Sequence, residues 1–189
     1  MPGFNLKFHT HRIILRPMRE SDAAEFAKIT GDPDLWKYFT HDLSEHDGLK
    51  EWVDEGLTLS KQQKRMAFTV IDRKTNSIAG STSLGNISER DRRIEIGWTW
   101  FGRIFHGRGI NDHSKFLLLN HCFENMEFVR VEFKTDVLNE PARVALKRIG
   151  AKEDGILRSH TLMTNGRRRD TIYYSILDSE WMTTISFEQ

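Results

Sequence analysis

The sequence predicts an α/β fold in which helices flank a central mixed, mostly antiparallel sheet. Three patterns indicate it. Between Met66 and Trp100, apolar and polar residues alternate, with short polar turns between the runs, as in successive antiparallel strands. A strand, a helix and a strand then follow up to Thr135, and such a βαβ unit places two parallel strands side by side. Asn165-Gly166 separates two further strand patterns, which is the strongest short hairpin signal.

The N-terminal part predicts one strand and two helices. His11 to Met18 alternates like a strand, and Pro17 within it is typical of a sheet edge. Ser21 is expected to cap a helix that ends near Gly31. A second helix is expected to start at Ser44 and end near Gln62. Its apolar stripe comprises Leu49, Trp52, Val53 and Leu57.

The next three strands are expected at residues 67–71, 78–87 and 94–100. In the third, period-two alternation predicts that Glu95 points away from the apolar face. That face is expected to carry Ile94, Ile96, Trp98 and Trp100.

After the meander, two helices and three strands are expected. A glycine-bearing loop at 106–109 leads into a helix with Phe116, Leu119, Phe123 and Met126 on one stripe. A strand follows at 129–135. Asn139 is a good N-cap for the next helix, which has Pro141 in its first turn and ends at Gly150. The hairpin strands are expected at 155–163 and 168–177.

Composition narrows the class of protein. The chain has 189 residues, 28 Lys and Arg against 27 Asp and Glu, and one cysteine. A chain of this length buries roughly 70% of its surface on folding, so we expect a single domain over residues 1–189. Balanced charge argues against a nucleic-acid-coating protein, and a lone cysteine favours a reducing, cytoplasmic setting. Neither the short apolar runs nor the N-terminal MPGFNLKFHTHR resembles a membrane anchor or signal peptide.

The loop His106-Gly107-Arg108-Gly109 is a candidate phosphate cradle. Unpaired amides and the dipole at a helix start favour an anion, and glycines let the main chain approach it closely. Taken alone, the two glycines are better explained by a tight strand-to-helix turn. Neither a dinucleotide fingerprint nor a P-loop lysine is present.

The chain resembles the GNAT acetyltransferases, and in particular their ribosomal-protein N-terminal acetyltransferase branch. The motifs that carry the resemblance are Ile13-Ile14-Leu15-Arg16-Pro17-Met18, Glu95-Ile96-Gly97-Trp98-Thr99-Trp100, His106-Gly107-Arg108-Gly109-Ile110-Asn111, Asn139-Glu140-Pro141-Ala142-Arg143, Gly155-Ile156-Leu157-Arg158-Ser159-His160, Arg169-Asp170-Thr171 and Tyr174-Ser175-Ile176-Leu177. It covers nearly the whole chain and is loosest between residues 34 and 66.

The resemblance implies a mixed sheet with a βαβ acetyl-CoA unit and direct acetyl transfer to a primary amine. It places the cofactor's diphosphate on residues 107–111, at Gly107, Arg108, Gly109, Ile110 and Asn111, after His106. The pantetheine arm is expected beside Trp100 and Phe101, with Asn139 as a further contact.

The cradle departs from the family pattern at four residues. His106 and Asn111 replace the usual residues, and Asp112-His113 replaces Thr-Glu, which brings a negative charge near the phosphate. Four basic residues on the two following helices either reach the remaining phosphate of coenzyme A or form a solvated face. They are Lys115, Arg143, Lys147 and Arg148.

Acetyl transfer needs a neutral amine, and Glu95 is the first choice of proton acceptor, with an ordinary structural Glu as the alternative. The thiolate's proton donor is missing, because Ala142 and Leu146 stand where the family has Ser and Tyr. Tyr173, His160 or a water molecule could supply this proton instead. The remaining alternative is that the enzyme lacks a donor and has low catalytic activity.

The leading hypothesis is an acetyl-CoA-dependent N-acetyltransferase acting on a protein N-terminus or a small amine. A non-catalytic acyl-CoA sensor is the rival. Four aromatic residues have two alternative roles: they line the pocket for the acceptor amine, or they belong to the hydrophobic core. They are Trp36, Phe39, Trp98 and Trp100. We expect no metal site, no nucleic-acid or membrane partner and a buried Cys122. The resemblance allows a homodimer, but no apolar stripe demands one.

Overall fold

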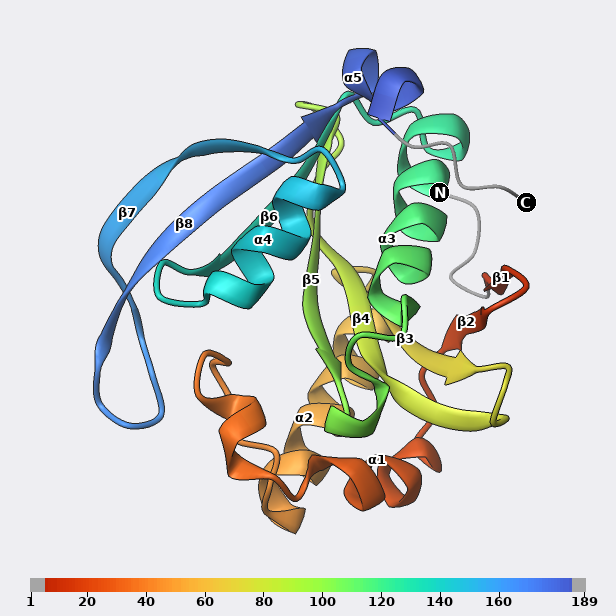
Figure 1. Cartoon of the computed structure of the whole chain (residues 1–189), viewed down its shortest axis with the longest axis vertical. Helices are drawn as coiled ribbons and strands as arrows, with labels where there is room; N and C mark the ends of the chain where they lie inside the picture. Colours follow the sequence, from red (N-terminus) through yellow and green to blue (C-terminus); the bar gives the residue numbers. More distant parts are fainter. Residues whose placement is uncertain (1–5, 185–189) are drawn as a thin grey trace.

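In the computed structural model, the described residues 6–184 form one eight-stranded sheet in the order β1-β2-β3-β4-β5-β6-β8-β7 (Figure 1). Within it, β5 and β6 are parallel and the other neighbouring pairs are antiparallel. The mixed, mostly antiparallel sheet is therefore confirmed. Residues 1–5 of the N-terminal stretch considered above and residues 185–189 lie outside the described residues.

The strands are β1 (Phe8–His9), β2 (Ile13–Pro17), β3 (Arg65–Asp72), β4 (Ser77–Ser88), β5 (Arg93–Phe101), β6 (Arg130–Asp136), β7 (Lys152–Leu162) and β8 (Arg168–Leu177). The helices are α1 (Asp22–Thr30), α2 (His46–Lys61), α3 (Ile110–Asn120), α4 (Glu140–Arg148) and α5 (Asp178–Thr184). A π-helical turn at His121–Asn125 extends α3, and 3-10 turns lie at Pro33–Trp36 and Arg103–Phe105.

Several elements form as their local sequence predicts. The side chain of Asn139 accepts a hydrogen bond from the Ala142 amide at 3.3 Å, so it caps α4 as expected. Gly166 has φ +79° in the turn between β7 and β8, a conformation that glycine adopts without strain. The βαβ unit of β5, α3 and β6 is also confirmed.

Two N-terminal predictions are wrong. β2 is not an edge strand, because β1 pairs with it on its outer side. Ser21 has helical backbone angles and makes no side-chain capping bond. Asp22 instead anchors this end of the helix: its carboxylate accepts from the Arg19 amide at 2.9 Å and from the Thr69 hydroxyl at 2.6 Å. Tertiary contacts with β3 therefore hold this end of α1.

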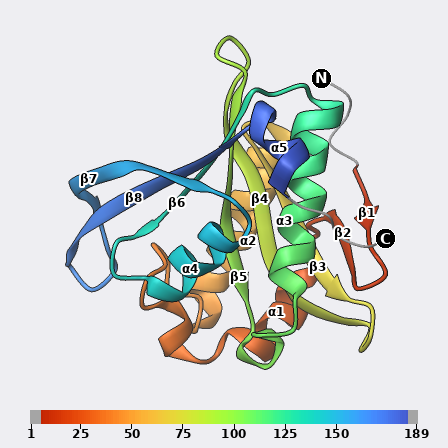
Figure 2. The ribbon, with the colours of Figure 1, turned by 45° about the horizontal axis from the view of Figure 1, so that its top comes forward.

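Helices cover both faces of the sheet (Figures 1 and 2). On one face, α3, α4 and α5 pack over a core of strand residues and contribute Leu118, Leu146 and Trp181. On the other face, α1 and α2 bury Phe26 and Trp52 in a second core. The sheet thus separates a face covered by α3, α4 and α5 from a face covered by α1 and α2.

A β-bulge in β5 overturns the predicted alternation of that strand. Ser81 pairs with Trp100 and Ser83 with Gly97, so one residue of β4 stands opposite two residues of β5. Trp98 adopts φ +51° at this point. Ile94 and Ile96 consequently pack in the core under α3, whereas Trp98 and Trp100 pack in the core under α1 and α2.

The buried face of α3 is also shifted from the predicted stripe. Its buried residues are Ile110, Ser114, Lys115, Leu118 and Leu119. Phe116 and Met126 of the predicted stripe are only partly buried. The helix is therefore rotated so that a lysine, rather than Phe116, faces the sheet.

Candidate functional site

The loop between β5 and α3 leaves open space at the start of the helix. Gly107 and Gly109 have φ values of +70° and +75°, in the left-handed region that disfavours residues with a Cβ. No atom lies within 4 Å of where a Cβ on Gly107 would stand, and at Gly109 the nearest is His113 Cδ2 at 3.9 Å. The first amides of α3 have no partner within the helix, so they and its dipole favour an anion here.

Side chains fix this loop to the sheet. The ring nitrogen Nε2 of His106 lies 2.9 Å from the Phe101 carbonyl oxygen, and Arg12 Nε donates to the Arg108 carbonyl at 3.3 Å. The charge that Asp112 brings to the loop is paired, because Arg148 of α4 donates to it at 2.6 Å. Arg148 therefore compensates the negative charge of Asp112 near the loop.

The parallel strands β5 and β6 are paired over a short distance only. Their register comprises Arg93 with Arg130, Ile94 with Val131, and Glu95 with Glu132. Beyond these pairs the strands diverge towards the loop end (Figure 1). Arg93 and Glu132 form an ion pair at 3.4 Å across the paired end. The divergence begins at Glu95.

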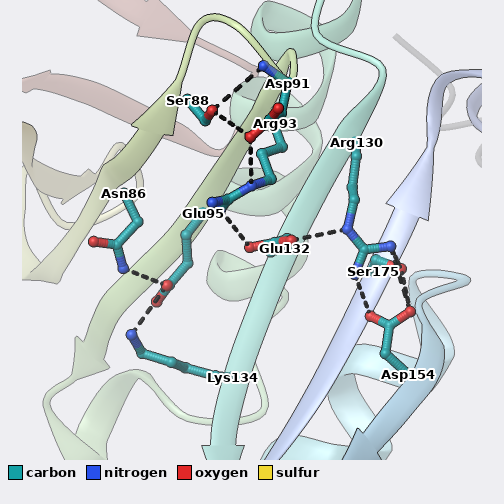
Figure 3. Close-up of polar contacts among 10 residues, drawn as sticks. All are labelled: Asn86, Ser88, Asp91, Arg93, Glu95, Arg130, Glu132, Lys134, Asp154 and Ser175. Atoms are coloured by element: carbon teal, nitrogen blue, oxygen red, sulfur yellow. Dashed lines mark hydrogen bonds and ion pairs between the residues drawn. The ribbon is translucent and has the colours of Figure 1, made fainter.

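Glu95 stands at the point of divergence and is 3% exposed. Figure 3 shows its carboxylate between Asn86 of β4 and Lys134 of β6. Oε2 accepts from Asn86 Nδ2 at 2.7 Å and pairs with Lys134 Nζ at 3.0 Å. Oε1 lies over Gly97, where a Cβ would approach it to 2.7 Å. The carboxylate is thus held through one oxygen.

Glu95 lies on the same face as Trp98, contrary to the prediction that the two point apart. Lys134 Nζ contacts the Glu95 carboxylate and lies 5.8 Å from the Trp98 ring centroid. The bulge causes this, because it turns Trp98 onto the face covered by α1 and α2. The Arg65 guanidinium lies 5.1 Å from the same ring.

A cavity of about 160 Å³ opens on this face, between the α1–α2 connection and the β7–β8 turn. It is lined by Pro33, Trp36, Lys37, Asp42, Met163, Thr164 and Asn165. Of the four aromatic residues considered for an acceptor pocket, Trp36 lines it. Trp36 is only 3% exposed and stacks edge-on against Trp100 at 5.4 Å, so it belongs to the core as well.

Helix α4 supplies no proton donor at the two positions where the resemblance expects one. Leu146 is buried in the core, and Ala142 has no ionisable group. Arg143 does not reach towards the loop, since it donates to the Tyr174 hydroxyl at 3.2 Å and to the Val137 carbonyl at 3.0 Å. Tyr173 stands opposite Lys134 in the antiparallel β6–β8 pair, on the face that carries Glu95.

Lys115 is the residue that sequence reasoning misjudged. It is only 4% exposed, and its Nζ donates to Thr99 Oγ1 at 2.8 Å. It neither reaches a phosphate position nor forms a solvated face. Its spacing from Leu118, Leu119 and Cys122 places it on one side of the helix with them, and that pattern could have revealed its burial.

The remaining reactive side chains considered above are buried or paired with other residues of the fold. Cys122 is fully buried, and burial raises its thiol pKa, so it behaves as a small apolar residue. Arg167 pairs with Asp136, and Arg169 is buried with its Nε donating to Thr171 at 3.0 Å. Within residues 6–184, no group of three or more His, Cys, Asp or Glu side chains is arranged to hold a metal ion.

Taken with the sequence motifs, the fold and site define a class of protein. A sheet that opens at one parallel pair, with a glycine loop starting the crossover helix, matches what the resemblance implies, namely a transferase that takes its acyl group from acetyl-CoA. Among the described residues, no helix is long and apolar enough to span a bilayer.

Comparisons with known proteins identify the family. Residues 12–152 match the family described as "Acetyltransferase (GNAT) domain". A Bacillus subtilis (strain 168) protein named "Putative ribosomal N-acetyltransferase YdaF" is 30% identical over 94% of this chain and 97% of its own length. The chain therefore belongs to the GNAT acetyltransferase family, whose members are acetyl-CoA-dependent N-acetyltransferases.

Solved structures agree on the fold. A GCN5-related N-acetyltransferase from Brucella melitensis superposes with a TM-score of 0.86 and 26% identity, covering 94% of this chain and 81% of that chain. Mycobacterium smegmatis RimJ in complex with CoA-disulfide has the same fold, with a TM-score of 0.78 and 22% identity over 89% of this chain and 83% of that chain.

Proposed function

We propose that this enzyme acetylates the α-amine of a protein N-terminus and that residues 107–111 bind the diphosphate of acetyl-CoA. The observation that carries the cofactor site is the open loop at the start of α3. Left-handed glycines at 107 and 109 leave its amides accessible, and the helix dipole adds to their attraction for an anion. The loop is held in place by two contacts: the His106 ring with the Phe101 carbonyl oxygen, and Arg12 with the Arg108 carbonyl oxygen.

The pantetheine arm extends from this loop along the diverging edge of β5, beside Trp100 and Phe101. Asn139 lies at the start of α4, on the β6 side of the divergence. Its Oδ1 accepts the capping bond from Ala142, which leaves its side-chain NH₂ to donate to an amide oxygen of the arm. The acetyl group then reaches the face of the sheet that carries Glu95.

Glu95 takes the proton from the acceptor amine. A terminal amine has an ordinary pKa near 8, so a carboxylate that removes its proton, directly or through a water molecule, makes it nucleophilic. Asn86 and Lys134 both contact Oε2 of Glu95. Oε1 is therefore the oxygen that accepts the proton of the amine. Burial and these contacts orient the carboxylate, as is needed for proton transfer.

A protein N-terminus fits the cavity better than a larger free ligand. Pockets for small-molecule ligands usually enclose about 300–1,000 Å³, whereas this cavity encloses about 160 Å³. That volume accommodates one terminal residue while the rest of an extended chain stays outside. Asp42 adds a carboxylate to the lining that attracts an ammonium group. The Bacillus subtilis relative is named "Putative ribosomal N-acetyltransferase YdaF", which points to the same acceptor class.

Residues 1–189 act as one domain, in the cytoplasm and without a metal ion. A lone, buried cysteine suits a reducing compartment. The reaction itself needs only a positioned thioester, a neutral amine and a proton acceptor.

The test is thiol release from acetyl-CoA over a matched acceptor panel. The panel pairs short peptides that have free N-termini with N-formylated copies of the same peptides, and adds small diamines. We expect release with the free peptides and none with the formylated ones, even when a lysine is present. Acetylation of the diamines alone would overturn the acceptor assignment.

A further inference from the structure

The feature that carries a further inference is the buried amine of Lys115. From α3, its side chain crosses to the sheet, where Nζ donates to Thr99 of β5 at 2.8 Å and lies 5.6 Å from the ring centroid of Phe133 on β6. Phe133 directly follows Glu132, the last β6 residue paired with β5. The amine therefore lies between the two parallel strands just beyond the point where they diverge.

Lys115 and Glu95 occupy opposite faces of the sheet at this divergence. Lys115 extends from α3 on the face that also carries α4, whereas Glu95 lies with Trp98 on the face covered by α1 and α2. An amine acceptor that enters from the Glu95 side would leave the thiol on the Lys115 side. The two ionisable groups are thus placed for the two proton transfers that the reaction needs.

The surroundings of Lys115 suit proton exchange near neutrality. Burial lowers its pKa to about 7, and the Glu95 carboxylate opposes that shift from across the sheet. Other charges near it are already paired: Lys134 of β6 with Glu95, and Asp112 of its own helix with Arg148. Thr99 and Phe133 contribute a hydroxyl and a ring face, and neither is charged.

We propose that Lys115 is the proton donor to the thiolate of coenzyme A as it leaves. This inference rests on the proposed cofactor site and supplies the acid that Ala142 and Leu146 of α4 cannot provide. The acceptor nitrogen forms a bond to the acetyl carbon, the carbon–sulfur bond breaks, and its electron pair stays on sulfur. A proton passes from Lys115 Nζ to sulfur, Glu95 takes the proton of the acceptor amine, and solvent restores both groups.

The first readout is the bound coenzyme A thiol, which requires no turnover. Ultraviolet absorbance of the thiolate gives its apparent pKa in complexes with wild type, Lys115→Met and Lys115→Arg. A cation within about 4–6 Å lowers a thiol pKa by roughly 1–3 units, so the pKa should rise by that amount in the Met variant and stay low in the Arg variant. An equal thiol pKa in all three proteins would overturn the proposal.

The second readout is the pH dependence of kcat. Loss of a general acid typically costs about 10²-fold or more, so both variants should be slowed while the Kd for coenzyme A is retained. Wild-type kcat should fall as Lys115 deprotonates, and this alkaline limb should be absent from both variants. A purely structural Lys115 would leave the limb in place. If wild type does not bind coenzyme A at all, the proposed cofactor site is wrong. That result differs from the failure of the Lys115 proposal, in which coenzyme A binds but its thiol pKa is the same in all three proteins.

Discussion

Replacing Lys115 by Met should change how the stability of the enzyme depends on pH, whatever the ligand does. Met has a similar length and fills the space between α3 and the sheet without a titratable group. Thr99 keeps polar partners after the change, since its Oγ1 also lies 2.8 Å from Thr82 Oγ1. The substitution therefore isolates the cost of burying an amine.

The sign and size follow from the lowered pKa. Burial lowers the pKa of Lys115 from 10.5 to about 7. Between these values the unfolded chain binds a proton that the folded chain does not, so the free energy of unfolding rises with pH by up to about 1.4 kcal/mol per unit. Relative to Lys115→Met, wild type should gain about 2 kcal/mol between about pH 7 and about pH 9. Below about pH 7 the difference should level off.

The assay is urea unfolding followed by tryptophan fluorescence at a series of pH values, with linear extrapolation to water. Lys147→Met, at an exposed position on α4, is the matched control. A flat difference for Lys115→Met across the alkaline range would refute the reasoning. It would mean that the amine is solvated in the folded protein.

Three further predictions test other parts of the site and fold. Gly109→Val should abolish coenzyme A binding in a titration while circular dichroism stays native, because the side chain would stand where the diphosphate lies; unchanged affinity would mean that the cradle is misplaced. Glu95→Gln should lower kcat about 10²-fold with the Kd for coenzyme A retained, and an unaltered pH–rate profile would exclude Glu95 as the base. Asp22→Ala should reduce the free energy of unfolding by roughly 1.5–3 kcal/mol, because it removes a buried carboxylate that makes charged hydrogen bonds to the partly buried Arg16. Asp34→Ala, at an exposed position, is the control for that change, and equal losses in urea unfolding would contradict the account.

Helices and turns whose ends are set by residues adjacent in the sequence were predictable from the sequence. The cap at Asn139, the proline in the first turn and the glycine after the helix define α4 within a few residues. The Asn165-Gly166 turn defines the β7–β8 hairpin in the same way, because glycine relieves a left-handed backbone that other residues resist. The glycine loop before α3 belongs to this group as well.

The site could be predicted only in part. Motif and position are enough to nominate residues 107–111 and Glu95 as candidates, but they do not predict the direction in which Glu95 points. An unbroken period of two places Trp98 on the opposite face from Glu95, and a single bulged residue reverses that relation. Bulges arise from pairing with a neighbouring strand, so the sequence of β5 alone does not reveal this one.

The sequence by itself determined the order of the helices and strands other than β1 and α5, and the glycine loop, because these depend on backbone preferences that act over a few residues. Its motifs also indicated the family. The tertiary structure decided which side chains meet at the divergence of β5 and β6. Lys115 illustrates the difference, since a lysine on a helix is ordinarily solvated. Only the rotation of α3 against the sheet buries this one between two strands, where the loss of water lowers its pKa.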